Sequence, residues 1–220
     1  MQRFLSSLPL SQLANLLVHQ TDAAFPDGDA LNIEELLPSM MTAQARLEHC
    51  FSAINNKYFF DGQSVVFDHL HGDQYATWLY LVSNQLYRDH GPTSWSKKIF
   101  LLNKMMHGCD LFYEVELPSI FLLVHPLGTV LGRGSYQDYL MVYQRCGVGS
   151  NHDVYPTLGR YVTMRPGSAV LGNSIVGDNT TIATESLVLD HTVLPNSIYF
   201  GNPRNYWTRE KSTPESLWRT

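Results

Sequence analysis

The sequence predicts an α+β protein: a helical domain over residues 1–107, a parallel β-helix over residues 108–205, and a C-terminal tail over residues 206–220. Two observations support this division. Apolar residues recur at helical spacing in the first half, and at intervals of six residues in the second half. A period of six fits neither a helix, at 3.6 residues per turn, nor a strand, at two. It is typical of a coil whose every turn has three short sides.

The first half is expected to contain four helices. Apolar spacing and turn residues place them over residues 5–17, 33–51, 74–87 and 96–106. For the third helix, Asp73 is the expected N-cap and Gly91-Pro92 the stop signal.

The second half contains two series of apolar residues that are six positions apart. The longer series is Leu158, Met164, Val170, Val176, Ile182, Val188 and Leu194, and the series before it is Val124, Val130, Tyr136, Val142 and Val148. These side chains are expected to point into the coil. A small or β-branched residue four positions later is expected at each tight corner: Val162, Ser168, Ser174, Thr180, Ser186 and Thr192. Stacked coils pair their backbone groups with the coils above and below.

A loop separates the two series. Residues 149–157 insert four residues beyond the period of six. Binding residues tend to lie on loops that a rigid scaffold positions, so this loop is a candidate part of a functional site.

Composition argues against several classes of protein. The chain is 44% hydrophobic and 16% charged, as expected of a packed core rather than disorder. A formal charge of −5 argues against a nucleic-acid partner. We expect no membrane span and no signal peptide, because no apolar run is long enough. Three cysteines without framework spacing, Cys50, Cys109 and Cys146, predict buried free thiols and a cytoplasmic location.

The stretch Asp110–Gly132 carries a distinctive spacing. Asp110 lies fifteen residues before His125, and His125 opens an H-x-x-G-x-x-x-G run. Together with the segment YPTLGRYVTMRPGSAVLGNSIVG and the ending GNPRNYW, this stretch resembles the serine acetyltransferase family of hexapeptide-repeat acyltransferases, over roughly residues 65–207. The resemblance implies a left-handed coil, acetyl-CoA as co-substrate and no metal.

The resemblance also implies catalytic roles for two residues. His125 is the expected general base, which removes the proton of an attacking hydroxyl. Asp110 is expected to hold the far ring nitrogen of His125 and to stabilise the imidazolium, as in a Ser-His-Asp triad whose hydroxyl comes from the substrate.

Departures from the family pattern bear on the acceptor. Val154 and Tyr155 stand where serine-acetylating members carry an Arg-His pair for the amino-acid carboxylate, and Val124 replaces an Asp. We therefore expect a sugar hydroxyl of a surface polysaccharide, O-antigen or capsule, or its precursor. His152 and Tyr155 on the loop, and Asp68 or Asp73 in the helical domain, are the expected acceptor contacts.

The family binds acetyl-CoA in a groove between neighbouring subunits. By resemblance, Ser150, Pro166 and Thr184 line this groove, and Arg165, Arg204 and Lys211 contact the phosphates. The same resemblance implies a homotrimer, and a hexamer where helical domains join two trimers.

Alternatives remain open at this stage. Serine O-acetylation for cysteine synthesis is the runner-up, although the ending PESLWRT lacks the family's terminal Ile. A trimeric β-helix carbonic anhydrase needs three converging histidines, and His125, His152 and His191 lack that spacing. A trimeric scaffold without activity is the non-enzyme alternative. The sequence leaves open the acceptor, the choice between oxygen and nitrogen, the acyl length and the oxyanion donors.

Overall fold

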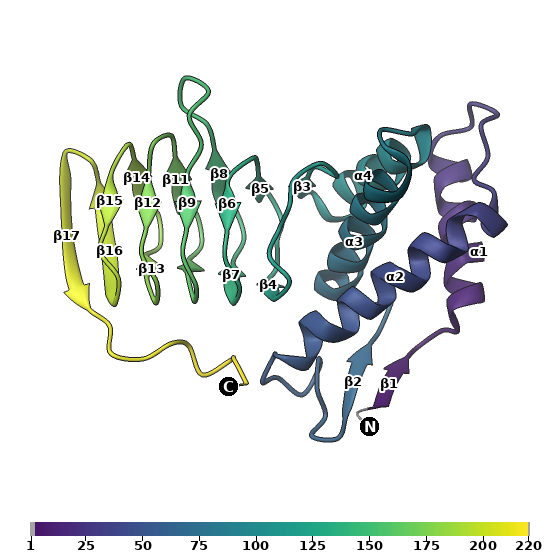
Figure 1. The fold of residues 1–220 in the computed structure, drawn as a ribbon, viewed down its shortest axis with the longest axis horizontal. Helices are drawn as coiled ribbons and strands as arrows, with labels where there is room; N and C mark the ends of the chain where they lie inside the picture. Colours follow the sequence, from purple (N-terminus) through teal and green to yellow (C-terminus); the bar gives the residue numbers. More distant parts are fainter. Residues whose placement is uncertain (1–2, 220) are drawn as a thin grey trace. The chain divides into compact units, whose positions relative to one another are not determined.

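The computed structural model describes residues 3–219, and the chain forms two compact units (Figure 1). One unit consists of the chain up to His107 together with Leu111–Glu114. The other consists of Gly108–Asp110 and the chain from Val115 onward.

The first unit contains the four predicted helices and a small parallel sheet. The helices are α1 (Leu10–Ala24), α2 (Ile33–Ser52), α3 (Gly72–His90) and α4 (Ser94–His107), and the strands are β1 (Arg3–Ser6) and β2 (Ser64–Phe67). Helix α3 packs against both α2 and α4, so its residues from Gln74 to Leu86 are buried. Gly91, with a φ of 76°, ends α3 as predicted.

Two local predictions in this unit were wrong. Leu5 lies in β1, which pairs in parallel with β2, and not in a helix. Pro9 explains the boundary, because the residue before a proline is disfavoured in a helix, and α1 begins directly after it. The N-cap of α3 is His71, so Asp73 lies in the first turn. Its negative charge there interacts favourably with the helix dipole.

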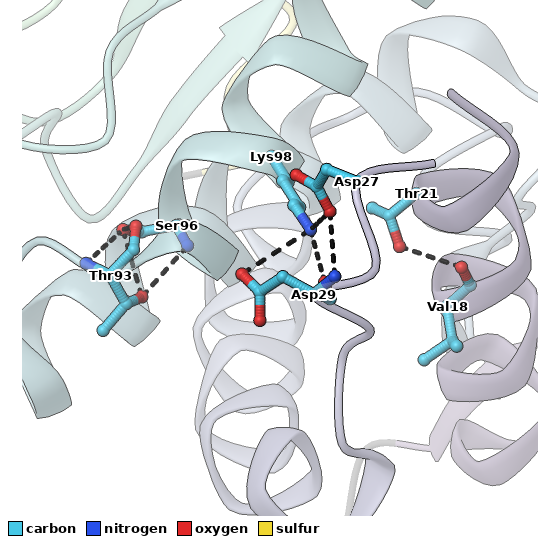
Figure 2. A network of polar contacts seen from close by, with 7 residues as sticks. All are labelled: Val18, Thr21, Asp27, Asp29, Thr93, Ser96 and Lys98. Carbon is cyan, nitrogen blue, oxygen red and sulfur yellow. Dashed lines mark hydrogen bonds and ion pairs between the residues drawn. The ribbon is translucent and has the colours of Figure 1, made fainter. Parts of the chain in front are cut away.

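A buried lysine fixes the loop between α1 and α2 (Figure 2). Lys98 on α4 has a side chain only 8% exposed, and its Nζ lies 2.7 Å from Asp27 Oδ1 and 3.6 Å from Asp29 Oδ2. Burial alone lowers the pKa of Lys98, but its bonds to Asp27 and Asp29 outweigh burial and raise it. The hydrogen bond from Lys98 lowers the pKa of Asp27.

The second unit is a parallel β-solenoid, as predicted. Its strands are β3 (Asp110–Leu111), β4 (Phe121–Leu123), β5 (Val130–Leu131), β6 (Ser135–Tyr136), β7 (Leu140–Val142), β8 (Gly147–Gly149), β9 (Thr157–Leu158), β10 (Thr163–Met164), β11 (Ala169–Leu171), β12 (Ile175–Val176), β13 (Thr181–Ile182), β14 (Leu187–Leu189), β15 (Thr192–Val193), β16 (Ser197–Asn202) and β17 (Asn205–Glu210).

These strands form the three faces of the solenoid. The first face has the order β17-β16-β13-β10-β7-β4, the second β14-β11-β8-β5-β3, and the third β15-β12-β9-β6. Neighbouring strands of these faces pair in parallel from β4 to β16, whereas β16 and β17 form an antiparallel hairpin at one end. Residues 206–210, which we expected in the tail, therefore lie within β17.

The six-residue period sets the core of this unit. Ten of the twelve predicted apolar positions have buried or half-buried side chains, and from Leu158 to Val188 none exceeds 1% exposure. The corner residues Val162, Ser168, Ser174, Thr180 and Ser186 are buried as well.

The predicted series fails at its two ends. Val130 is 48% exposed and Leu194 71% exposed, and the inward residues are Leu131 and Val193 instead. At the first predicted position the inward residue is Leu123, which pairs with Val142, whereas Val124 is half-buried. The reason is the length of the corners. The step from Leu123 to Leu131 is eight residues, and the step from Val188 to Val193 is five. Thr192, expected at a buried corner, is exposed for the same reason, and Ser197 is buried instead.

Candidate active site

His125 lies on a bulge at the corner between β4 and β5. Strand pairing aligns Leu123 with Val142 and Leu131 with Val148, yet the corner that carries His125 is two residues longer than the corner beside it. Val124 N–H still donates to Val142 O, and Arg145 N–H to Leu127 O. The two additional residues are therefore His125 and Pro126.

The bulge presents the imidazole to solvent from a rigid framework. His125 has a positive φ of 50° and is exposed, and its carbonyl accepts a hydrogen bond from Leu127 N–H at 2.7 Å. A positive φ is uncommon in a residue with a side chain and is found at sites that the surrounding structure holds in place. This arrangement suits a group that must reach a bound substrate.

Asp110 lies beside the turn that carries His125. Its strand, β3, neighbours β5. Asp110 N–H donates to Thr129 O at 2.8 Å, and Gly128 N–H donates to Gly108 O at 2.8 Å. The separation of fifteen residues in the sequence thus corresponds to neighbouring rungs of the solenoid. The half-buried Asp110 lies on the rung next to the bulge.

The predicted loop is a tight hairpin. Asn151 and Val154 exchange both backbone hydrogen bonds at 3.1 Å. The central residues His152 and Asp153 have φ values of 50° and 59°, as a type I′ turn requires. The Asn151 amide donates to Asp190 at 2.7 Å, which ties the hairpin to a later coil. His152 and Tyr155 are exposed.

One longitudinal edge of the solenoid connects His125 with two of the predicted acetyl-CoA contacts. His125, Pro166 and Thr184 each lie two residues after an inward residue of the first face: Leu123, Met164 and Ile182. They therefore occupy the same corner in different coils. Neighbouring strands are about 4.8 Å apart, so Thr184, three rungs from His125, lies about 14 Å along this edge.

A cationic pocket of about 500 Å³ opens beside Thr184 on the first face. Predicted contacts Arg165, Thr184 and Lys211 all line it, together with Thr181, Arg209 and Glu215. Burial lowers the pKa of Lys211. The Glu215 carboxylate partly offsets this lowering, and the positive charge of Arg165 adds to it. The other two predicted contacts lie elsewhere: Ser150 directly follows β8, and Arg204 lies in the β16–β17 turn.

The structure places the remaining predicted site residues in the helical unit. Asp68 lies in the turn before α3, where its carboxylate accepts a hydrogen bond from Leu70 N–H at 2.9 Å. Asp73 lies in the first turn of α3, and both residues are half-buried.

The thiols are unsuited to nucleophilic catalysis. Cys50, Cys109 and Cys146 are buried thiols, as predicted. Burial raises the pKa of Cys109 to about 12 and also raises the pKa of Cys146, so both thiols stay protonated near neutral pH. Within residues 3–219, no cluster of His, Cys, Asp or Glu could hold a metal ion, and no helix is long and apolar enough to cross a membrane.

Sequence reasoning missed two charged residues of the cationic pocket, Arg209 and Glu215. It had assigned both to a tail. The signal was present for Arg209, because Trp207, Arg209 and Lys211 alternate as the residues on one face of a strand do. Glu215 follows β17 and has no such pattern.

Comparison with known proteins shows similarity to serine acetyltransferases. No family model matches the sequence. The chain is 24% identical over 120 residues to the serine acetyltransferase of Staphylococcus epidermidis, covering 52% of this chain and 56% of that protein. It is 27% identical over 113 residues to that of Synechococcus elongatus, covering 49% and 46%. The chain spans about half the length of the curated relatives it matches.

Solved structures match over nearly the whole chain. The serine acetyltransferase of Neisseria gonorrhoeae has a TM-score of 0.71 at 21% identity, covering 94% of this chain and 82% of that one. The enzyme of Brucella abortus in complex with coenzyme A has a TM-score of 0.72 at 16% identity, covering 95% and 85%. At these identities the likeness shows the fold, which is the one that the sequence predicted.

Proposed function

We propose that this chain, similar in sequence and fold to serine acetyltransferases, is an acetyl-CoA-dependent O-acetyltransferase that acts on the hydroxyl of a small acceptor. The observation that carries the proposal is the placement of His125 on an exposed bulge, with Asp110 on the neighbouring rung. The names of the curated relatives and the coenzyme A complex of a structural neighbour support the same activity.

In the proposed reaction the acceptor attacks acetyl-CoA directly. His125 takes the hydroxyl proton as the oxygen bonds to the thioester carbon. Asp110 orients the imidazole and stabilises its protonated form. The C–S bond then breaks, and the imidazolium returns the proton to the departing CoA sulfur. An acetyl-cysteine intermediate has no support, because all three thiols are buried and burial raises the pKa of Cys109 and Cys146.

The edge of the solenoid has the right length for acetyl-CoA. The pantetheine arm has about thirteen bonds between sulfur and phosphate and spans about 15 Å when extended, taking three bonds per ~3.5 Å. The edge from His125 to Thr184 measures about 14 Å by strand spacing. A thioester at His125 therefore places the phosphates at the pocket of Arg165, Thr184 and Lys211. Ser150, Pro166 and Arg204 are further proposed contacts.

For the acceptor we propose a sugar hydroxyl of a surface polysaccharide or its precursor. Val154 and Tyr155, which are 44% and 40% exposed, supply no cation for a carboxylate where the resemblance places an Arg-His pair. His152, Tyr155, Asp68 and Asp73 are the proposed acceptor contacts. L-serine is the second candidate, because the curated relatives carry that name.

The proposed assembly is a cytoplasmic homotrimer. The solenoid leaves apolar side chains such as Ile175 and Leu127 exposed, at 50% and 67%. Packing of three chains is one way to cover them and to complete an acetyl-CoA groove between subunits. Pairing of two trimers through the helical unit gives the hexamer.

The test is release of CoA from acetyl-CoA against a panel of acceptors. The panel contains L-serine, nucleotide-activated sugars and oligosaccharide fragments of a surface polymer. Turnover with a sugar supports the whole proposal. Turnover with serine alone contradicts the sugar acceptor and leaves the transferase in place. Failure to bind acetyl-CoA at all contradicts the transferase.

A further inference from the structure

The cationic pocket already contains an anion from its own chain. Glu215 Oε1 lies 2.9 Å from Arg165 Nη2 and 3.9 Å from Lys211 Nζ. Arg165 also donates to Tyr143 Oη at 3.1 Å, and Lys211 donates to Thr181 Oγ1 at 2.9 Å. The carboxylate thus rests against two cations that the chain itself holds in place.

The pocket has more positive than negative charge. Arg165, Arg209 and Lys211 face one carboxylate, Glu215, within the same lining. The Lys211 side chain is only 9% exposed, whereas Glu215 is 25% exposed and Arg165 34%. A lysine whose side chain is buried beside other cations favours an anionic ligand with more charge than one carboxylate, such as a phosphate.

Glu215 belongs to a segment that runs back along the solenoid after β17 (Figure 1). Lys211 contacts β13 through Thr181, Glu215 contacts Arg165 after β10, and Trp218 packs edge-on against Tyr139 before β7, with ring centroids 5.5 Å apart. Trp218 is 5% exposed. The backbone N–H of Trp218 donates to the backbone carbonyl of Glu215 at 3.3 Å, which links the Trp218 contact to the Glu215 contact.

We infer that Glu215 is an internal competitor for phosphate, and that a phosphorylated ligand enters this pocket by displacing the Glu215 side chain and loosening residues 213–219. The inference rests on the proposed function for the identity of the natural ligand, coenzyme A. It adds an autoinhibitory contact, because the C-terminal segment opposes binding until the ligand supplies a stronger anion.

Binding calorimetry with coenzyme A and with inorganic pyrophosphate tests the competition. Glu215→Gln removes the competing charge and should tighten both ligands by roughly tenfold, the size expected for loss of one charge-assisted contact. The matched control is Glu210→Gln, which removes the same charge from the adjacent strand β17 at an exposed position. An affinity gain no larger than that of Glu210→Gln overturns the inference.

Hydrogen exchange of residues 213–219 tests the displacement in the unaltered protein. Saturation with coenzyme A should speed exchange in this segment, and Glu215→Gln should speed it without ligand. Slower exchange on binding overturns the inference, because the segment then closes over the ligand. If Glu215→Gln binds pyrophosphate more tightly but the wild-type protein transfers no acetyl group, the inference is supported and the proposed function is contradicted. If the wild-type protein transfers the acetyl group but Glu215→Gln binds pyrophosphate no more tightly, only the inference is contradicted.

Discussion

At the residue scale, the proposed catalytic pair of His125 and Asp110 rests on a resemblance to serine acetyltransferases, carried by a separation of fifteen residues and a glycine pattern. The bulge that carries His125 could not be predicted from the sequence. The period of six placed Val124 and Val130 inside the coil, whereas the strand pairing shows that Leu123 and Leu131 are the inward residues on either side of this corner. The spacing of apolar residues does not locate a short insertion in one corner; the strand pairing is needed to find it.

The Asp27–Lys98 pair gives a prediction that depends on pH. The pKa of Asp27 is lowered from its usual 3.8, so its contribution to stability is present above that pH and is lost as the pH falls through the lowered value. We expect Asp27→Asn to unfold at lower temperature than wild type at pH 7, and the difference to vanish in acid. Thermal unfolding across this range measures it. A difference that persists in acid, or that the exposed Asp22→Asn reproduces, contradicts the prediction.

At the element scale, the coil could be predicted because its core repeats. Each turn of the solenoid buries one apolar residue per side, so from Leu158 to Val188 a single spacing identifies the inward residues. The hairpin strand β17 could not be recognised this way. It pairs in antiparallel orientation with β16 beyond the last coil, and its residues are exposed. Strand β1 escaped notice because its partner lies about sixty residues away.

A matched pair of leucines tests the corrected register. Leu158 is 0% exposed and Leu194 is 71% exposed, although both belong to the predicted series of apolar residues spaced six positions apart. Leu158→Ala should lower the free energy of unfolding by about 2–5 kcal/mol because it leaves a cavity. Leu194→Ala should change it by less than about 0.5 kcal/mol. Urea unfolding followed by circular dichroism gives both values, and equal losses contradict the register.

At the scale of the whole molecule, the chain combines a helical unit and a solenoid, and the proposed acetyl-CoA site belongs to the solenoid. The edge from His125 to Thr184 and the cationic pocket beside it are built by β4, β10, β13, β17 and the segment after β17. Composition and period predicted the fold class. They could not predict that the C-terminal segment would return to this edge, because that path depends on pairwise contacts of Glu215 and Trp218.

The most direct test of the account is the rate of CoA release from acetyl-CoA by His125→Ala, with the acceptor that the panel identifies. We predict a loss of at least about a hundredfold in kcat, the contribution of a general base, with unchanged affinity for coenzyme A. His191→Ala, on a later coil of the same solenoid, is the control and should keep its activity. If His125→Ala keeps most of the wild-type rate, the bulge at the β4–β5 corner is not the catalytic centre.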